Sequence, residues 1–209
     1  MRTRFTLLLF MTYLFVCGQT SKLEYDWQNK IAEKEKKTIL DYYLLLPSEL
    51  LTGERNLNSK SGPKDSYMFR IQSTQTECGK VNLVNGYLVA CPDAYIHLAL
   101  FRDRNNARDI IAYVKDCGEV PIQSCDYGFL YFDLERKIWK NANDVFPFER
   151  MKEKCLKIEK KKNWFDRQEI MPYFILPEFG TTIKVMDSFS DDKHLLFTTK
   201  WNGERFEIQ

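Results

Sequence analysis

The stretch KVNLVNGYLVAC, from Lys80 to Cys91, decides the fold class of this chain. Short runs of mostly apolar residues lie on both sides of Asn85-Gly86, and Asn-Gly between two such runs is the strongest short signal for a β-hairpin. A two-residue turn places four apolar side chains on one buried face, namely Val81, Leu83, Leu88 and Ala90. The core is therefore expected to be built from antiparallel hairpins.

Further runs of the same kind follow along the chain. AYIHLALFR and DIIAYVKD predict a second hairpin, YGFLYFDL and KIWKN a third, and HLLFTTKWNGERFEI a last one. YMFRIQS, residues 67–73, is also expected to be a strand. The sequence predicts an α+β fold, mainly antiparallel β, in which an N-terminal helix is followed by a β-meander of hairpins.

The first residues, MRTRFTLLLFMTYLFVCGQTS, have the order of a secretory signal peptide. Two arginines give a basic start, and Phe5–Val16 is an uncharged apolar run that is short for a membrane span. We expect a signal peptide over residues 1–18. It is either a type I signal or a lipoprotein signal that ends before Cys17, since LFVC resembles a lipobox in which Val16 replaces the usual small residue. The expected location is the periplasm, the cell envelope or the medium, with membrane contact only through lipid on Cys17.

The rest of the chain divides into three parts. Residues 19–51 are expected to form an N-terminal helical segment, because apolar side chains recur at helical spacing through residues 22–45. Residues 52–65 are polar and contain Gly and Pro, which indicates a loop or linker. Residues 66–209 form a β-rich domain. Residues 150–162 within it fit a helix or a strand, and we favour a short helix because their charged residues are good helix formers.

The charge balance narrows the class of partner. The chain has 31 basic and 29 acidic residues, and the part after residue 18 has 29 of each. A formally neutral protein has no broad attraction for a polyanion, so nucleic acid is not an expected partner.

Five cysteines follow the signal peptide, and an exported chain meets oxidising conditions. Cys117 and Cys125 enclose GEVPIQS, a loop that a disulfide would close with little strain. Cys78 and Cys91 flank the first hairpin and are the second expected pair, which leaves Cys155 as the odd thiol. The spacings match no zinc site.

Two groups of residues have side chains suited to catalysis or metal binding. His97, in YIHLALF, is a candidate general base, although we favour a partly buried structural histidine. Carboxylates and an imidazole that suit a divalent cation gather in DSFSDDKH, namely Asp187, Asp191, Asp192 and His194. Asp and Ser are also typical of a turn, which is the interpretation we favour. The sequence contains no nucleophile elbow and no phosphate-binding glycine motif, so no catalytic residue, metal or cofactor is assigned.

Aromatic residues make up 14% of the chain, which predicts either β-rich core packing or a groove for a glycan or peptide. In the last hairpin, a two-residue turn at Asn202-Gly203 would pair Thr199 with Phe206 and leave Trp201 where the sheet ends. Trp201 is therefore expected to be partly exposed and to be a ligand contact.

Several segments resemble those of a known group of proteins. NGYLVACPDAYIHLALFR, IWKNANDVFP, LPEFGTTIKV and KWNGERFEI, all within residues 66–209, resemble small exported β-rich proteins of Bacteroidetes-type bacteria. The resemblance implies export and a β-rich architecture, and it carries over no catalytic residue. Because the sequence carries no catalytic or cofactor motif, we expect an exported, non-catalytic, envelope-associated or secreted binding module for an unknown protein or glycan. The alternative is a secreted hydrolase with an acidic or His97-centred site.

Overall fold

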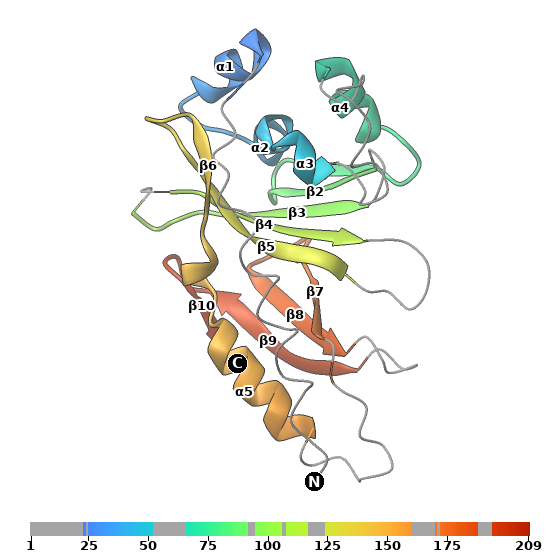
Figure 1. Cartoon of the computed structure of the whole chain (residues 1–209), viewed down its shortest axis with the longest axis vertical. Coiled ribbons are helices and arrows are strands. Elements are labelled where there is room, and N and C mark those ends of the chain that lie inside the picture. The colour runs from blue at the N-terminus through green and yellow to red at the C-terminus, as the bar shows by residue number, and fades with distance from the viewer. Residues whose placement is uncertain are drawn as a thin grey trace, which may run out of the picture.

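A computed structural model of the chain confirms the α+β class with mainly antiparallel sheets. Figure 1 shows a layer of helices, a central sheet and a second, smaller sheet. The structure describes residues 23, 25–51, 66–91, 95–105, 108–116, 124–159, 170, 172–187 and 194–209. The predicted signal peptide, Cys17 and the predicted linker 52–65 lie outside these residues.

The central sheet is a meander in which six strands follow one another in chain order. Each strand pairs antiparallel with the next, so the three hairpins predicted in this region are confirmed. The strands are β1 (Lys80–Asn82), β2 (Tyr87–Ala90), β3 (Ile96–Phe101), β4 (Ile110–Asp116), β5 (Ser124–Asp133) and β6 (Ile138–Asn141).

The second sheet has four strands in the order β10-β9-β8-β7 and is also an antiparallel meander. The predicted break near Pro177 and Gly180 lies between β7 and β8, where Gly180 has a φ of 78°. The strands are β7 (Pro172–Ile175), β8 (Thr182–Asp187), β9 (Leu195–Trp201) and β10 (Phe206–Ile208).

The helical part differs from the prediction in two respects. The N-terminal segment is three short helices rather than one, and YMFRIQS is a helix rather than a strand. The Ser66 side chain accepts the Phe69 N–H at 3.1 Å, which is an N-cap that begins a helix. The helix at residues 150–162 is confirmed over Phe148–Glu159. The helices are α1 (Asp26–Ala32), α2 (Ile39–Leu45), α3 (Ser48–Leu51), α4 (Tyr67–Ser73) and α5 (Phe148–Glu159), with a 3-10 turn η4 (Asn143–Val145).

Both faces of the central sheet are buried. One face, which includes Leu98, packs under α1–α3, and the other face, which includes Phe101, packs against the four-stranded sheet and α5 (Figure 1). Successive side chains of a strand point to opposite faces, so a strand covered on both sides is apolar throughout. This accounts for the continuous apolar run IHLALF in β3.

The first hairpin has a four-residue turn instead of the predicted two-residue turn, because Val81 pairs with Leu88. The shift of two residues keeps the predicted face, so Leu88 and Ala90 are buried as expected. It also leaves Val81 37% and Leu83 52% exposed, so their assignment to the core is wrong.

An Asn or Asp at the end of the first strand explains the wider turns. The Asn82 side chain accepts the N–H of Asn85, Asp133 accepts two turn N–H groups before β6, and Asn202 accepts two before β10. Such side-chain bonds replace the tight backbone turn with a longer one. In the last hairpin they pair Trp201 with Phe206 instead of Thr199 with Phe206.

Candidate functional site

A fully buried cation, Arg70, joins helices of the helical layer to one another. The Arg70 guanidinium donates to the backbone oxygens of Leu44 at 2.8 Å and Leu46 at 2.6 Å, and to the Ser48 hydroxyl at 3.1 Å. Carbonyls at the C-terminal end of a helix have no intrahelical partner and attract positive charge. Arg70 of α4 therefore caps α2 and fixes the two helices to each other.

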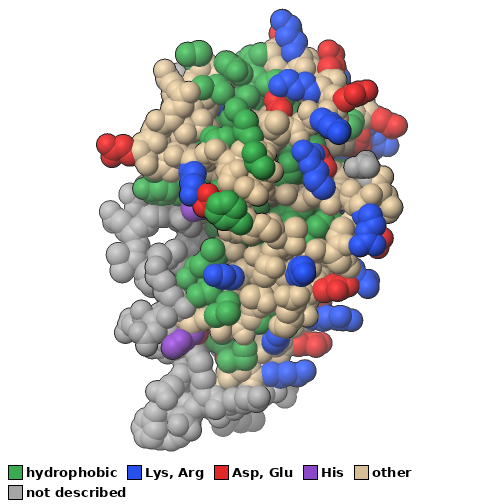
Figure 2. Space-filling view, turned by 180° about the vertical axis from the view of Figure 1, so that it is seen from behind, with side chains coloured by type: hydrophobic (Ala, Val, Ile, Leu, Met, Phe, Trp, Pro, Cys, Tyr) green, Lys and Arg blue, Asp and Glu red, His purple; other side chains and the backbone are tan. Residues whose placement is uncertain are grey.

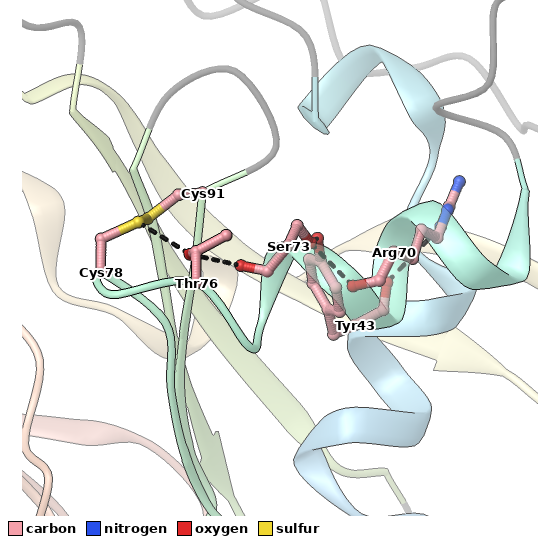
Figure 3. The surroundings of a disulfide bond; sticks show 6 residues. All are labelled: Tyr43, Arg70, Ser73, Thr76, Cys78 and Cys91. Carbon is pink, nitrogen blue, oxygen red and sulfur yellow. Dashed lines mark hydrogen bonds between the residues drawn. A yellow bond between two sulfur atoms is a disulfide. The ribbon is translucent and has the colours of Figure 1, made fainter.

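A second contact joins the same two helices. The buried hydroxyls of Tyr43 and Ser73 lie 2.6 Å apart, and the Ser73 carbonyl accepts the N–H of Cys91 at 3.0 Å (Figure 3). Because burial is its largest influence, the pKa of Tyr43 is raised above its ordinary value, so this hydroxyl stays neutral. The end of α4 is thus attached both to α2 and to the end of β2.

Three aromatic rings extend across the outer side of this layer, and we name them the aromatic strip: Tyr25, Trp27 and Tyr67. The Tyr25 and Trp27 rings are stacked with centroids 6.0 Å apart, and Tyr67 meets Trp27 edge-on at 5.6 Å. The Arg70 guanidinium lies 5.6 Å from the Trp27 ring. The strip is therefore a row of rings from the start of α1 and from α4, and its central ring, Trp27, lies beside the buried Arg70 side chain.

The strip is accessible to solvent. Tyr67 is 43% exposed, and its neighbour Met68 is 60% exposed. Trp27 is partly buried and packs against the core under the helices. Figure 2 shows hydrophobic side chains gathered at the helical end of the molecule. Partly exposed aromatic rings that pack on a core can stack on a sugar ring or cover an apolar side chain.

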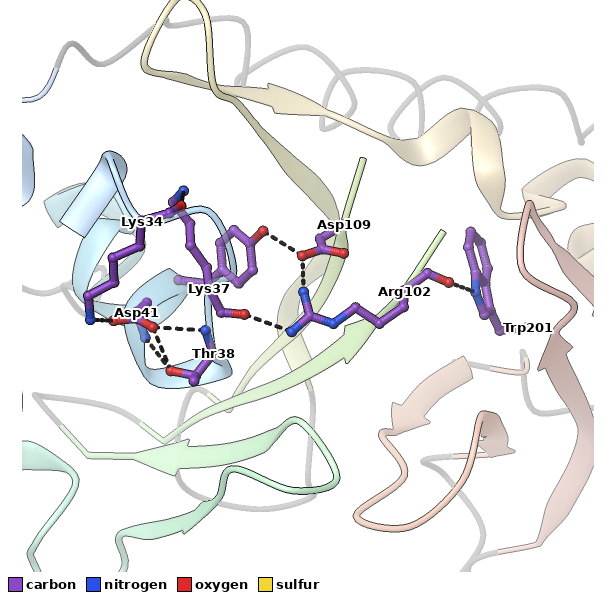
Figure 4. A network of polar contacts seen from close by, with 8 residues as sticks. Lys34, Lys37, Thr38, Asp41, Arg102, Asp109 and Trp201 are labelled. Atoms are coloured by element: carbon purple, nitrogen blue, oxygen red, sulfur yellow. Dashed lines mark hydrogen bonds and ion pairs between the residues drawn. The ribbon is translucent and has the colours of Figure 1, made fainter. Parts of the chain in front are cut away.

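A polar network lies on the other side of α2 (Figure 4). Asp109 accepts the Tyr42 hydroxyl at 2.7 Å and also pairs with Arg102. Arg102 donates to the Lys37 carbonyl at 2.7 Å and accepts the Trp201 indole N–H at 2.8 Å through its own carbonyl. The network links the helices, the β3–β4 hairpin and β9.

Burial and neighbouring groups shift the pKa values of the titratable side chains in this network. Burial lowers the pKa of Lys37, which is 2% exposed, while the Asp41 and Asp109 carboxylates oppose that shift. Burial alone would raise the pKa of Asp41, but its bonds from Lys34 and Thr38 outweigh it and hold the pKa below the ordinary range. Burial and then Asp109 raise the pKa of Tyr42. Each of these groups is bonded to a neighbour in the fold, so the network is a structural link between layers.

Trp201 does not have the predicted exposure. It is 6% exposed, packs against Phe101 and Phe206, and donates its indole N–H to Arg102. The first half of the turn beside it is partly covered, because Arg104 donates to the backbone oxygens of Asn202 and Gly203 at 2.8 Å each. This aromatic residue is part of the core between the sheets.

The other candidate residues are only partly within the described residues. His97 is partly buried on β3, and its Nδ1 lies 3.2 Å from the Tyr87 hydroxyl. Asp187 is 3% exposed and His194 is exposed, and the Asp187 N–H donates to the His194 carbonyl at 2.9 Å. Asp191 and Asp192 lie outside the described residues. Within those residues, no three His, Cys, Asp or Glu side chains are grouped so that they could hold a metal ion.

The cysteines are also only partly within the described residues. Cys78 and Cys91 form a disulfide, which confirms the second predicted pair. Cys117 lies outside the described residues, so the pair of Cys117 with Cys125 stays a prediction. Cys155 is a buried free thiol in α5, and burial, with Glu159 and Asp187 adding to it, raises its pKa to about 11. A thiol with so high a pKa is protonated at neutral pH and is a poor nucleophile.

Sequence reasoning did not single out the aromatic strip. Tyr67 was assigned to a strand, and only the N-cap signal of Ser66 could have placed it on a helix facing Trp27. Among the described residues, no helix has the length and apolar character required to cross a membrane.

Comparisons with known proteins give no relative. No family model matches the chain, and searches of curated proteins and of solved structures find no significant match.

Proposed function

We propose that this protein is an exported, non-catalytic binding module that recognises a glycan or a protein through the aromatic strip. The observation that carries the proposal is the row of Tyr25, Trp27 and Tyr67 on a layer fixed by the buried Arg70. Rings that are already ordered lose little conformational freedom when a ligand arrives, which favours binding.

Two features support export. The Cys78–Cys91 disulfide is typical of proteins outside the reducing cytosol. The N-terminal sequence has the order of a signal peptide, ending at residue 18 or just before Cys17. An intact mass of the protein from its native host tests this part: it should correspond to removal of the leader or to a lipid-bearing Cys17. A mass that retains the leader without lipid would contradict export by this route.

Tryptophan fluorescence during ligand titration tests the binding proposal. The indoles of Trp139 and Trp201 are buried and already bonded to backbone oxygens, at 2.7 Å and 2.8 Å, whereas Trp27 is accessible. A ligand that stacks on the strip should therefore change the Trp27 emission, which is followed in a Trp164→Phe background because Trp164 lies outside the described residues. Envelope glycans and solubilised envelope proteins are titrated separately, so that the two ligand classes are distinguished.

Matched variants locate the binding surface. Tyr67→Ala should reduce affinity about fivefold or more, because the loss of an aromatic hot-spot contact costs about 1 kcal/mol or more. Phe179→Ala removes an aromatic side chain that is 68% exposed on the β7–β8 turn and should leave binding unchanged. Equal affinity of Tyr67→Ala and the unaltered protein would show that the strip is not the binding surface. Saturable substrate turnover that His97→Ala abolishes, with the fold intact, would instead establish the hydrolase alternative.

A further inference from the structure

A hollow lies beside the disulfide and has no part in the aromatic strip. Its volume is about 610 Å³, and it is lined by Thr76, Glu77, Cys78 and Tyr95. Binding sites for small groups commonly have volumes of about 300–1,000 Å³. The Tyr95 ring is 50% exposed, and Thr76 and Glu77 are also exposed, so the hollow is open to a ligand.

The segment that carries three of these residues is rigid. Cys78 is bonded to Cys91, and the Thr76 hydroxyl lies 3.3 Å from the Ser73 carbonyl and 3.1 Å from the Cys78 sulfur (Figure 3). The Gly79 N–H donates to the Thr76 carbonyl at 2.9 Å, and a Cβ at Gly79 would lie 2.2 Å from the Thr74 carbonyl oxygen. The turn after α4 therefore holds one wall of the hollow in a single shape.

The chemistry of the lining favours a cation. Among the described residues that line the hollow, Glu77 is the charged one, and it forms no ion pair with any other residue that the structure describes. Lys80, the basic residue that follows it most closely in sequence, pairs with Glu178 at 2.6 Å. A tyrosine ring attracts a cation to its face, and a carboxylate beside the ring adds a second attraction for the same group.

We propose that this hollow binds the side chain of an arginine or a lysine in a peptide segment of a partner protein. The guanidinium or ammonium group lies on the Tyr95 ring and pairs with the Glu77 carboxylate. The Thr76 hydroxyl oxygen is placed beside them as a further acceptor. The disulfide preorganises these groups, and the site is independent of any ligand on the aromatic strip.

Two peptides that differ in one charge test the proposal on the oxidised full-length mature protein. The first is acetyl-Gly-Gly-Arg-Gly-Gly-amide, and the second has citrulline in place of arginine, which keeps the shape and removes the charge. Amide chemical shifts are followed by NMR during each titration. We expect the arginine peptide to shift the amides of residues 76–78 and Tyr95 saturably, with a Kd of about 1 mM, and the citrulline peptide to bind about fivefold more weakly.

Two variants and a control identify the residues responsible. Glu77→Gln should weaken binding of the arginine peptide about fivefold, and Tyr95→Leu about threefold. Glu204→Gln removes an exposed carboxylate at the β9–β10 turn and should leave affinity unchanged. Because Glu77 and Tyr95 are exposed, neither substitution removes a buried contact that the fold requires.

Three results would overturn the proposal. One is equal affinity for the arginine and citrulline peptides, and another is an unchanged affinity in Glu77→Gln. The third is saturable binding of glucosamine, but not of the arginine peptide, at the same amides, which would assign the hollow to an amino sugar instead.

Discussion

Replacing Arg70 with methionine should destabilise the protein more than any exposed charge replacement. The side chain is fully buried, and its guanidinium donates to the carbonyls of Leu44 and Leu46, also buried, at 2.8 and 2.6 Å. A hydrogen bond from a charged donor contributes about 1.5–3 kcal/mol, and a buried carbonyl left without its donor adds a desolvation penalty. Methionine fills much of the volume but donates nothing. We expect the free energy of unfolding to fall by about 3–5 kcal/mol.

Equilibrium urea unfolding of the oxidised protein, followed by far-UV circular dichroism, measures this change. Arg205→Met is the matched control, because that side chain is 72% exposed and its contact with Glu207 is long, at 3.9 Å. The control should change the free energy by less than about 0.5 kcal/mol. Arg70→Lys should recover only part of the loss, because an ammonium cannot reproduce the planar fork of donors. A loss below about 1 kcal/mol in Arg70→Met would refute the role of Arg70 as the link between α2 and α4.

Other predictions concern the disulfide, the buried thiol and the indole between the sheets. Replacing Cys78 and Cys91 together by serine should lower the free energy of unfolding by about 3 kcal/mol, because the disulfide joins residues with a sequence separation of 13 and so restricts the unfolded chain. A change below about 1 kcal/mol in urea unfolding would contradict this prediction. The Cys155 thiol has a pKa of about 11 in the fold and about 9 when exposed, so its contribution to stability is complete below about pH 9 and is lost as pH rises to about 11. In Cys155→Ala, the free energy of unfolding should therefore fall less steeply over that pH range than in the unaltered protein. Parallel pH profiles of the two proteins would contradict the raised pKa of Cys155. Trp201→Phe removes the indole bond to the Arg102 carbonyl and should cost about 1–2 kcal/mol in thermal or urea unfolding, whereas an unchanged stability would mean that the bond contributes nothing.

Local signals predicted much of the sheet structure. Short runs rich in apolar and aromatic residues between turn residues identified the hairpins of β3 with β4, β5 with β6 and β9 with β10, because strand preference and turn chemistry are local properties. The same reasoning misplaced the register at two turns by two residues. The Asn82 and Asn202 side chains determine those turns, and their bonds to turn N–H groups are also local, so Asn or Asp before the turn was a usable signal.

The candidate site was not predictable in the same way. Tyr67 and Trp27 are 40 positions apart in sequence and meet only because α4 packs beside α1. Trp201 was expected to be exposed at a sheet end, but the β3–β4 hairpin covers it through Arg102 and Arg104. Exposure depends on which distant segment lies over a side chain, and no local pattern contains that information.

The sequence by itself determined the antiparallel hairpins, and it favoured a helix at residues 150–162 and offered Cys78–Cys91 as a pair, because each depends on residues close together in the chain. Only the tertiary structure decided the layer order, the burial of Arg70 and Lys37, and which aromatic rings face solvent. Layer order and burial depend on the free energy gained when apolar surfaces that are far apart in the sequence come together. A short stretch of sequence does not contain that information.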